Sequence, residues 1–169
     1  WHNMLNSLAA IAVATKLAVS DDAIISSLAV FKGVGRRFQV NGDLAIDGGK
    51  LTLVDDYGHH PKEISATLEA LHQAWPERRS VIIFQPHRYT RTRDLFEDFV
   101  QILSTVDVLI LMDVYPAGET VITGADGRAL SRAIRMRAQV DPIFVDGWQE
   151  LPTILAGIVK PEDVILTMG

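Results

Sequence analysis

The chain has 169 residues, the length of one ordinary domain, and 48% of them are hydrophobic, enough to bury a full core. The formal net charge of -5 argues against a nucleic-acid partner, because nucleic-acid-binding domains usually carry a basic excess. The absence of cysteine excludes disulfides and thiolate metal sites and fits a reducing compartment, and no apolar stretch is long enough to span a bilayer, so we expect no membrane partner.

The chain opens with two predicted helices. Residues 3–18 are rich in Ala and Leu, and Ser20 suits the N-cap of a second helix that ends at Phe31-Lys32-Gly33. Next comes a predicted hairpin, in which short strands at 38–40 and 44–46 flank Asn41-Gly42, a strong turn signal.

From residue 51 onward, short apolar runs alternate with helical patterns. Continuous apolar runs of this length are typical of strands buried on both faces. The alternation predicts an α/β fold with a doubly wound, mostly parallel sheet and flanking helices. The predicted strands are 51–54, 81–84, 108–112, 143–145 and 164–166, and the helical patterns are 64–75, which Pro61 opens, 95–106, 130–134 and 151–158.

Polar side chains follow three of these strands, in the segments Asp55–Pro61, Gln85–Arg93 and Asp113–Glu119. Open parallel sheets bind their ligands beyond the carboxyl ends of the strands. We therefore expect the three segments to converge on one site.

The first segment combines carboxylates with histidines. Asp55 and Asp56 are adjacent where the chain leaves a strand and point to opposite sides, so one can face the cleft while the other caps a neighbouring element. The imidazole group is the side chain best suited to proton transfer at physiological pH, which makes His59 and His60 candidates for handling a proton. A helix-capping turn before Pro61 accounts for Asp55 and His60 equally well.

The second segment is rich in arginine. Guanidinium groups bind carboxylates or phosphates in bidentate fashion, and Arg88 and Arg91 lie three residues apart, close enough to share one anion. A solvated surface is the alternative, but the position at a strand's carboxyl end favours function. In the third segment Glu119 is a candidate site residue, although turn chemistry explains its neighbours equally well.

The glycine-rich stretches are weak signals. Gly33-Val34-Gly35 lacks the third glycine of a dinucleotide fingerprint, because Phe38 stands at that position. The nearest approach to a phosphate loop is Gly48-Gly49-Lys50, which Leu51 follows. Spacing alone favours a helix stop before an exposed Arg37.

Two other classes of protein deserve comparison. A metal-dependent hydrolase would use Asp55, Asp56, His59, His60, His87 and Asp113, but adjacent histidines suit joint ligation poorly, so we expect no metal site. A receiver-like signalling module would need a lysine at the end of a later strand, and none of the predicted strands ends in one.

Five motifs, in order along the chain, resemble the C-terminal domain of the Mur ligases, ATP-dependent amide-forming enzymes of peptidoglycan synthesis. The resemblance implies that residues 1–169 are one such domain of a longer, cytoplasmic bacterial enzyme, without its N-terminal UDP-binding and central ATP-binding domains. Members usually continue past Gly169 into a last helix, without which one sheet face would be less covered. The motifs are His2-Asn3-Met4-Leu5-Asn6, Gly33–Phe38, Val54–Pro61, Phe84–Asp94 and Asp113–Glu119.

The resemblance is strongest to the members that join L-alanine to UDP-N-acetylmuramate through an acyl phosphate. It implies ATP and Mg²⁺ as cofactors, held mainly by the central domain, and an inactive chain in isolation. Members that attach a tripeptide during recycling also carry His-His-Pro, but typically have Phe-Ala where this chain has Tyr57-Gly58.

The same resemblance assigns roles to individual residues. Asn3 and Asn6, which spacing alone makes helix-capping residues, would lie near the adenine. Asp56 would bind the ribose and Arg37 the terminal phosphate. The L-alanine pocket and the catalytic set would draw on Tyr57, His59, His87, Arg88, Arg91 and Arg37, with His59, His87 and Arg37 as the catalytic residues.

Overall fold

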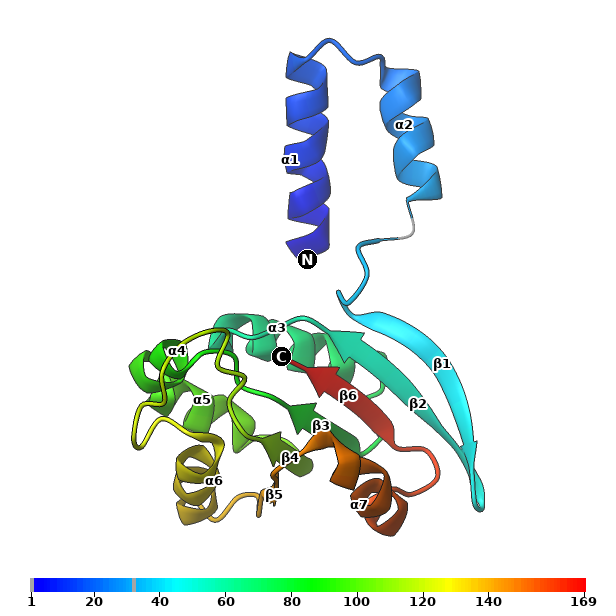
Figure 1. Cartoon of the computed structure of the whole chain (residues 1–169). Coiled ribbons are helices and arrows are strands. Elements are labelled where there is room, and N and C mark those ends of the chain that lie inside the picture. Colours follow the sequence, from blue (N-terminus) through cyan, green and yellow to red (C-terminus); the bar gives the residue numbers. More distant parts are fainter. Residues whose placement is uncertain (1, 32) are drawn as a thin grey trace. The chain divides into compact units, whose positions relative to one another are not determined.

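Contacts within the chain divide it into two compact units, Trp1–Val34 and Gly35–Gly169, in a computed structural model that describes residues 2–31 and 33–169 (Figure 1). The first unit contains α1 (His2–Lys16) and α2 (Asp21–Val30). Ser20 caps α2 as predicted, because its hydroxyl accepts a hydrogen bond from the backbone N–H of Ala23. The domain predicted over 1–169 is thus built as two units.

The second unit begins with a hairpin whose turn differs from the predicted one. Strands β1 (Gln39–Ile46) and β2 (Gly49–Asp56) pair antiparallel, with the last residue of β1 opposite the first of β2. Asp47-Gly48 is therefore the two-residue turn, and Gly48 has a positive φ of 81°, which glycine adopts without steric cost.

The predicted turn at Asn41-Gly42 is wrong, because both residues lie inside β1. The register shifts between Val40 and Gly42, which marks a β-bulge, and Gly42 has a φ of 97°. Asn-Gly and Asp-Gly are equally good turn signals. The later one prevails because it lets β1 pair along all of β2.

Six strands form one sheet in the order β1-β2-β6-β3-β4-β5, and every neighbouring pair except β1 and β2 is parallel. The predicted doubly wound, mostly parallel α/β fold is confirmed. The last strand of the chain lies inside the sheet, between β2 and β3 (Figure 1). The remaining elements are α3 (Pro61–Ala74), β3 (Ser80–Phe84), α4 (Tyr89–Asp94), α5 (Phe96–Leu103), β4 (Val108–Met112), α6 (Gly127–Met136), β5 (Ile143–Val145), a 3-10 turn (Trp148–Glu150), α7 (Leu151–Ile158) and β6 (Val164–Met168).

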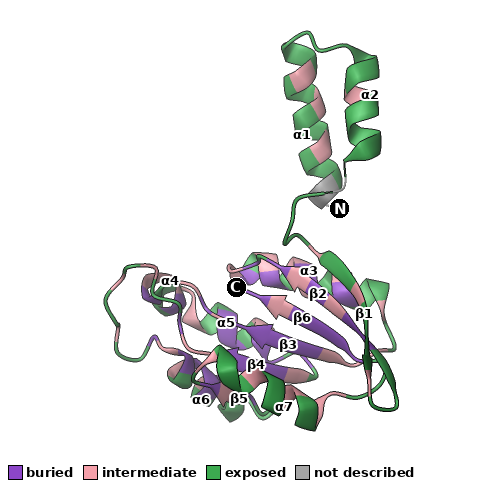
Figure 2. Cartoon of the chain, turned by 45° about the vertical axis from the view of Figure 1, so that its right-hand side comes forward, coloured by how far each residue is buried: buried purple, intermediate pink, exposed green. Residues whose placement is uncertain are grey.

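Strand side chains alternate between two cores. In β3, Ile82 and Phe84 join the larger core with residues of α3, α5 and α6, while Val81 and Ile83 face the smaller core beside α7. Buried residues are concentrated in the central strands (Figure 2). None of the helices in the described parts of the chain is both long and apolar enough to cross a membrane.

The helical pattern predicted over 95–106 corresponds to α5, and a short helix that was not predicted, α4, precedes it. Helix α4 ends at Asp94, α5 begins at Phe96, and Leu95 between them has non-helical φ and ψ of −116° and 23°. Helix α5 ends at Leu103, so Val106 contributes to the core from beyond the helix.

Gly127 lets α6 begin directly against the end of β4. A Cβ at this position would lie 2.9 Å from the Cα of Asp113 and closer still to the carbonyl oxygen of Met112. The Gly127 N–H also donates to the Asp113 carboxylate, at 3.0 Å. A glycine is needed here because two of the three obstructing atoms belong to backbone, which cannot shift as a side chain can.

We predict that Gly127→Ala lowers the free energy of unfolding by about 1–3 kcal/mol, the usual cost of overpacking. Urea unfolding of this chain measures the change. Gly157→Ala is the matched control, because a Cβ there meets nothing within 4 Å in α7, and it should be neutral or slightly stabilising. Equal losses in the two variants would contradict this account.

Candidate functional site

A cleft of about 210 Å³ opens where the carboxyl ends of β2, β3, β4 and β6 meet. The three segments Asp55–Pro61, Gln85–Arg93 and Asp113–Glu119 all contribute to it, so the structure brings them together as expected. The lining side chains and backbone belong to Arg36, Tyr57, His59, Gln85, His87, Tyr115 and Gly169.

One wall of the cleft is a continuous row of cationic and aromatic side chains. The Arg36 guanidinium lies 5.0 Å from the centre of the Tyr57 ring, which meets His59 edge-on at 5.2 Å. The His59 ring is 5.8 Å from that of His87, which stacks on Tyr115 at 5.4 Å. Two imidazoles, from the loops that follow β2 and β3, thus lie side by side at the centre of the row.

The position of the proton on His59 follows from its neighbour. Its Nδ1 lies 3.0 Å from the carbonyl oxygen of Tyr57. A carbonyl only accepts, so in the neutral ring Nδ1 carries the proton and Nε2 keeps a free lone pair. That leaves Nε2 as a proton acceptor.

Glu63 fixes the backbone beneath this imidazole. Its Oε2 accepts hydrogen bonds from the N–H groups of His59 and His60 at 3.1 and 3.2 Å, and lies 3.9 Å from the His59 Nδ1. Burial acts to raise the pKa of Glu63, but the backbone hydrogen bonds and the charge of His59 outweigh it and the pKa falls. Glu63 therefore stays ionised and holds the loop.

His87 is kept neutral by its surroundings. Burial lowers the pKa of its imidazole, and the positive charges of Arg91, His59 and Arg88 lower it further. A guanidinium nitrogen of Arg91 lies 3.1 Å from the His87 carbonyl oxygen and 3.4 Å from its Nδ1. Because a guanidinium only donates, Nδ1 is the acceptor and the ring proton is on Nε2.

The two adjacent carboxylates point to opposite sides, as predicted. Asp55 accepts from Arg36 at 3.1 Å and from the Thr167 hydroxyl at 2.7 Å. Asp56 is buried, and its two oxygens accept from the backbone N–H groups of Phe38 and Gly58, both at 2.7 Å. Asp56 thus joins two loops, and its predicted ribose role stays a prediction.

His60 has the capping role that the sequence left open. Its Nδ1 accepts from the backbone N–H of Lys62 at 3.2 Å, and Glu63 accepts from the backbone N–H of His60, which together make a capping box at the start of α3. Pro61 occupies the first turn of α3, as expected. The Nδ1 of His60 is therefore engaged at the start of α3.

Arg36 is a site residue that the sequence did not single out. It lines the cleft, donates to Asp55 and to the carbonyl oxygen of Gly169, and has a φ of 57°. Arg37, the predicted phosphate ligand, is exposed, and its charge is felt by Glu63. Two consecutive arginines after a glycine look alike in sequence, and only the fold decides that Arg36 is the one that lines the cleft.

The remaining predicted residues lie outside the cleft lining. Arg91 donates a hydrogen bond to the carbonyl oxygen of His87 but does not line the cleft, and Arg88 is exposed at the start of α4. Asn3 and Asn6 belong to α1 in the first unit: Asn6 is exposed, and the side chain of Asn3 lies outside the described residues. The adenine, phosphate and carboxylate roles of these residues stay predictions.

The hydrolase alternative finds no support in the geometry. Within residues 2–31 and 33–169, no group of three or more His, Asp or Glu side chains is arranged to hold a metal ion. Asp113, one of the ligands it required, instead accepts from the backbone N–H groups of Val114 and Gly127.

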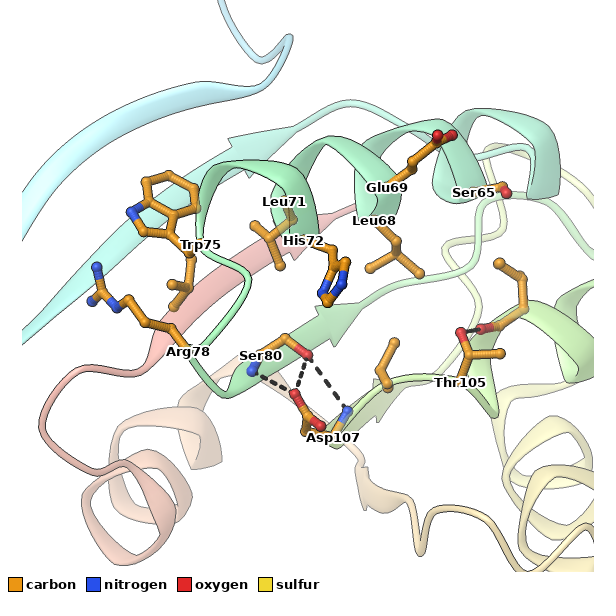
Figure 3. A pocket seen from close by; sticks show the side chains of 13 residues that line it. Ser65, Leu68, Glu69, Leu71, His72, Trp75, Arg78, Ser80, Thr105 and Asp107 are labelled. Carbon is orange, nitrogen blue, oxygen red and sulfur yellow. Dashed lines mark hydrogen bonds between the residues drawn. The ribbon is translucent and has the colours of Figure 1, made fainter.

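A larger groove of about 410 Å³ lies between α3 and α5, at the amino ends of the parallel strands (Figure 3). The Asp107 carboxylate on its rim accepts from both the N–H and the hydroxyl of Ser80, each at 2.8 Å. No predicted site residue lines this groove. Parallel sheets bind ligands at the opposite edge, so the smaller cleft is the candidate site.

Comparison with known proteins places the chain in a family. Residues 36–169, which are almost the whole second unit, match the family model described as Mur ligase, glutamate ligase domain. This chain belongs to the Mur ligase family.

Relatives of this Mur ligase chain are much longer than it is. It is 62% identical over all 169 residues to the UDP-N-acetylmuramate–L-alanine ligase of Methylococcus capsulatus, of which it covers 36%. The crystal structure of the Thermotoga maritima UDP-N-acetylmuramate-alanine ligase matches 99% of the chain with a TM-score of 0.72 and 26% identity, over 34% of that protein. A murein peptide ligase of Psychrobacter arcticus shares the fold, with a TM-score of 0.68, 22% identity and coverage of 99% and 34%.

We predict that Arg91→Gln raises the pKa of the His87 imidazole, because a positive charge beside the ring is removed while its burial remains. An NMR titration of the imidazole protons in this chain measures it. Arg132→Gln, an exposed arginine on α6, is the control and should leave that pKa unchanged. No shift in Arg91→Gln would refute the electrostatic account.

The lowered pKa also has a consequence for stability. The folded state disfavours protonation of His87, so the neutral imidazole contributes fully to the free energy of unfolding above the ordinary pKa of imidazole. That contribution is lost as the pH falls through the lowered pKa of His87 in the folded chain.

Proposed function

We propose that this chain holds the incoming amino acid in an ATP-dependent ligase that joins L-alanine to UDP-N-acetylmuramate. The observation that carries the proposal is the cleft itself, where the family's motif residues Tyr57, His59 and His87 converge. The 62% identity with the UDP-N-acetylmuramate–L-alanine ligase of Methylococcus capsulatus supports L-alanine as the substrate.

The cleft offers what an amine nucleophile needs. An α-ammonium group must lose a proton before it can attack, and the free Nε2 of His59 is a suitable acceptor. His87 is neutral, so it adds no positive charge against the ammonium. The substrate carboxylate would be bound by Arg88 and Arg91, whose forked guanidinium groups match a carboxylate.

Attack of the amine on an acyl phosphate of the muramyl group forms the amide bond and releases phosphate. ATP would supply the phosphoryl group, and the exposed Arg37 suits contact with its terminal phosphate. Mg²⁺ would neutralise phosphate charge, and a central domain would hold most of its ligands.

This proposal places the chain in a longer, cytoplasmic bacterial enzyme whose N-terminal and central domains bind the UDP-sugar and ATP. The chain spans about a third of the length of the relatives that it matches, which supports further domains as its partners.

Gly58 supports L-alanine over a tripeptide. A Cβ at position 58 would lie 2.8 Å from the Asp56 Oδ1 that accepts the Gly58 N–H. The Phe-Ala form of the tripeptide-adding relatives would therefore need the Asp56 carboxylate to shift away from the position that it has here. Comparing product formation with L-alanine and with the tripeptide, in the full-length enzyme, separates the two substrates.

In the full-length enzyme, we predict that His87→Ala lowers the rate of phosphate release with L-alanine and UDP-N-acetylmuramate about 100-fold or more, since His87 packs against the proton-accepting His59. His72→Ala is the control, because His72 is exposed on α3 and lines the other groove. Wild-type rates in His87→Ala would rule out the proposed site.

Arg37→Ala tests the phosphate role separately. We expect it to raise the KM for ATP in the full-length enzyme, while the KM for L-alanine changes little, because a guanidinium facing a phosphate is lost. Unchanged kinetics with ATP would remove Arg37 from the site. The isolated chain should neither hydrolyse ATP nor form product, which a phosphate-release assay measures.

A further inference from the structure

The loop that follows β4 is fastened to the start of α4 in two places. Along the main chain, the N–H of Arg88 donates to the Tyr115 carbonyl at 2.9 Å, and the N–H of Tyr115 donates to the Pro86 carbonyl at 2.8 Å. Farther on, the carboxylate of Glu119 accepts from both the N–H and the hydroxyl of Thr90, at 3.0 and 2.7 Å. Glu119 therefore makes a two-point attachment to the first turn of α4.

This attachment replaces a cap that α4 lacks. The first N–H groups of a helix have no partner within the helix, and a side chain just before the first turn usually accepts from one of them. The residue in that position is Arg88, which makes no such hydrogen bond. Glu119, from 29 residues along the chain, supplies the missing acceptor.

The charge of Glu119 is secured by the same contacts. The hydrogen bonds from the Thr90 hydroxyl and N–H lower the pKa of Glu119, and the positive charge of Arg88 adds to the effect. Glu119 is therefore ionised at neutral pH, which strengthens both hydrogen bonds.

The turn that Glu119 holds is the one that carries the two arginines. Arg88 precedes α4 with a φ of 74°, in the left-handed region that a residue with a side chain seldom adopts. Its backbone must therefore be held by surrounding contacts, and Arg91 follows one turn later against His87.

We propose that Glu119 is a positioning residue for the amino-acid site: by capping α4 it directs Arg88 and Arg91 toward the carboxylate of the substrate. This inference rests on the proposed function, in which those arginines bind L-alanine. It extends the site to a residue that lies outside the cleft lining.

The test is steady-state kinetics of the full-length enzyme with Glu119→Ala. Losing two charge-assisted hydrogen bonds should raise the KM for L-alanine about tenfold or more, with little change in kcat or in the KM for ATP. Glu119→Gln should recover most of the loss, because its amide oxygen can still accept the Thr90 N–H.

Two controls make the outcome specific. Glu97→Ala removes another carboxylate, which pairs with Arg137 on the exposed side of α5, and should leave every KM unchanged. Thermal unfolding of each variant reports any general loss of structure. An unchanged KM for L-alanine in Glu119→Ala, or a uniform loss across all substrates with a lower melting temperature, would overturn the positioning role.

The result can be told apart from failure of the proposed function. If the wild-type enzyme does not release phosphate when L-alanine is supplied, the substrate assignment fails. If it does, and Glu119→Ala matches it in the KM for L-alanine, only the role of Glu119 fails.

Discussion

The pairing of β6 between β2 and β3 is the constraint on which the rest of the second unit depends. The last strand in sequence bonds to strands that precede it by about a hundred residues, and it closes a sheet that would otherwise be two separate pieces. At its carboxyl end, the Thr167 hydroxyl donates to Asp55 and the Met168 carbonyl accepts the N–H of Gln85. These contacts fix the carboxyl ends of the strands at which the cleft forms. Gly169 lies there against Gln85, and a side chain at position 169 would overlap the backbone of Gln85.

Most of the carboxylates around the cleft accept hydrogen bonds from backbone N–H groups. Asp56, Glu63, Asp113 and Glu119 each accept one or more N–H groups that loops and helix starts leave without partners. The side chains that face the cleft include guanidinium, imidazole and phenol groups. The carboxylates thus hold the loops around the cleft in place. The cationic and aromatic wall suits an anionic group of a ligand, next to an imidazole that can accept a proton. It also explains why a dense set of acidic and histidine residues makes no metal site in the described residues.

The sequence predicted the strands well because their apolar runs are long enough to be buried on both faces. It could not choose between Asn41-Gly42 and Asp47-Gly48, since both are good hairpin turns and only the pairing partner of β1 decides. Nor could it separate Arg36 from Arg37, whose side chains differ in direction rather than in chemistry.

By itself, the sequence determined the α/β class, the three polar segments at strand ends and the family. Apolar runs and short motifs are local features of the chain, so they can be recognised without knowing which segments pack together. The tertiary structure alone decided which of those residues share a cleft. It placed Arg36 in the cleft lining and engaged His60 and Asp113 in hydrogen bonds to the first residues of α3 and α6. It also brought the rings of His59 and His87 side by side. Such choices depend on strand order and on which backbone N–H groups need a partner, and neither is a local property of the chain.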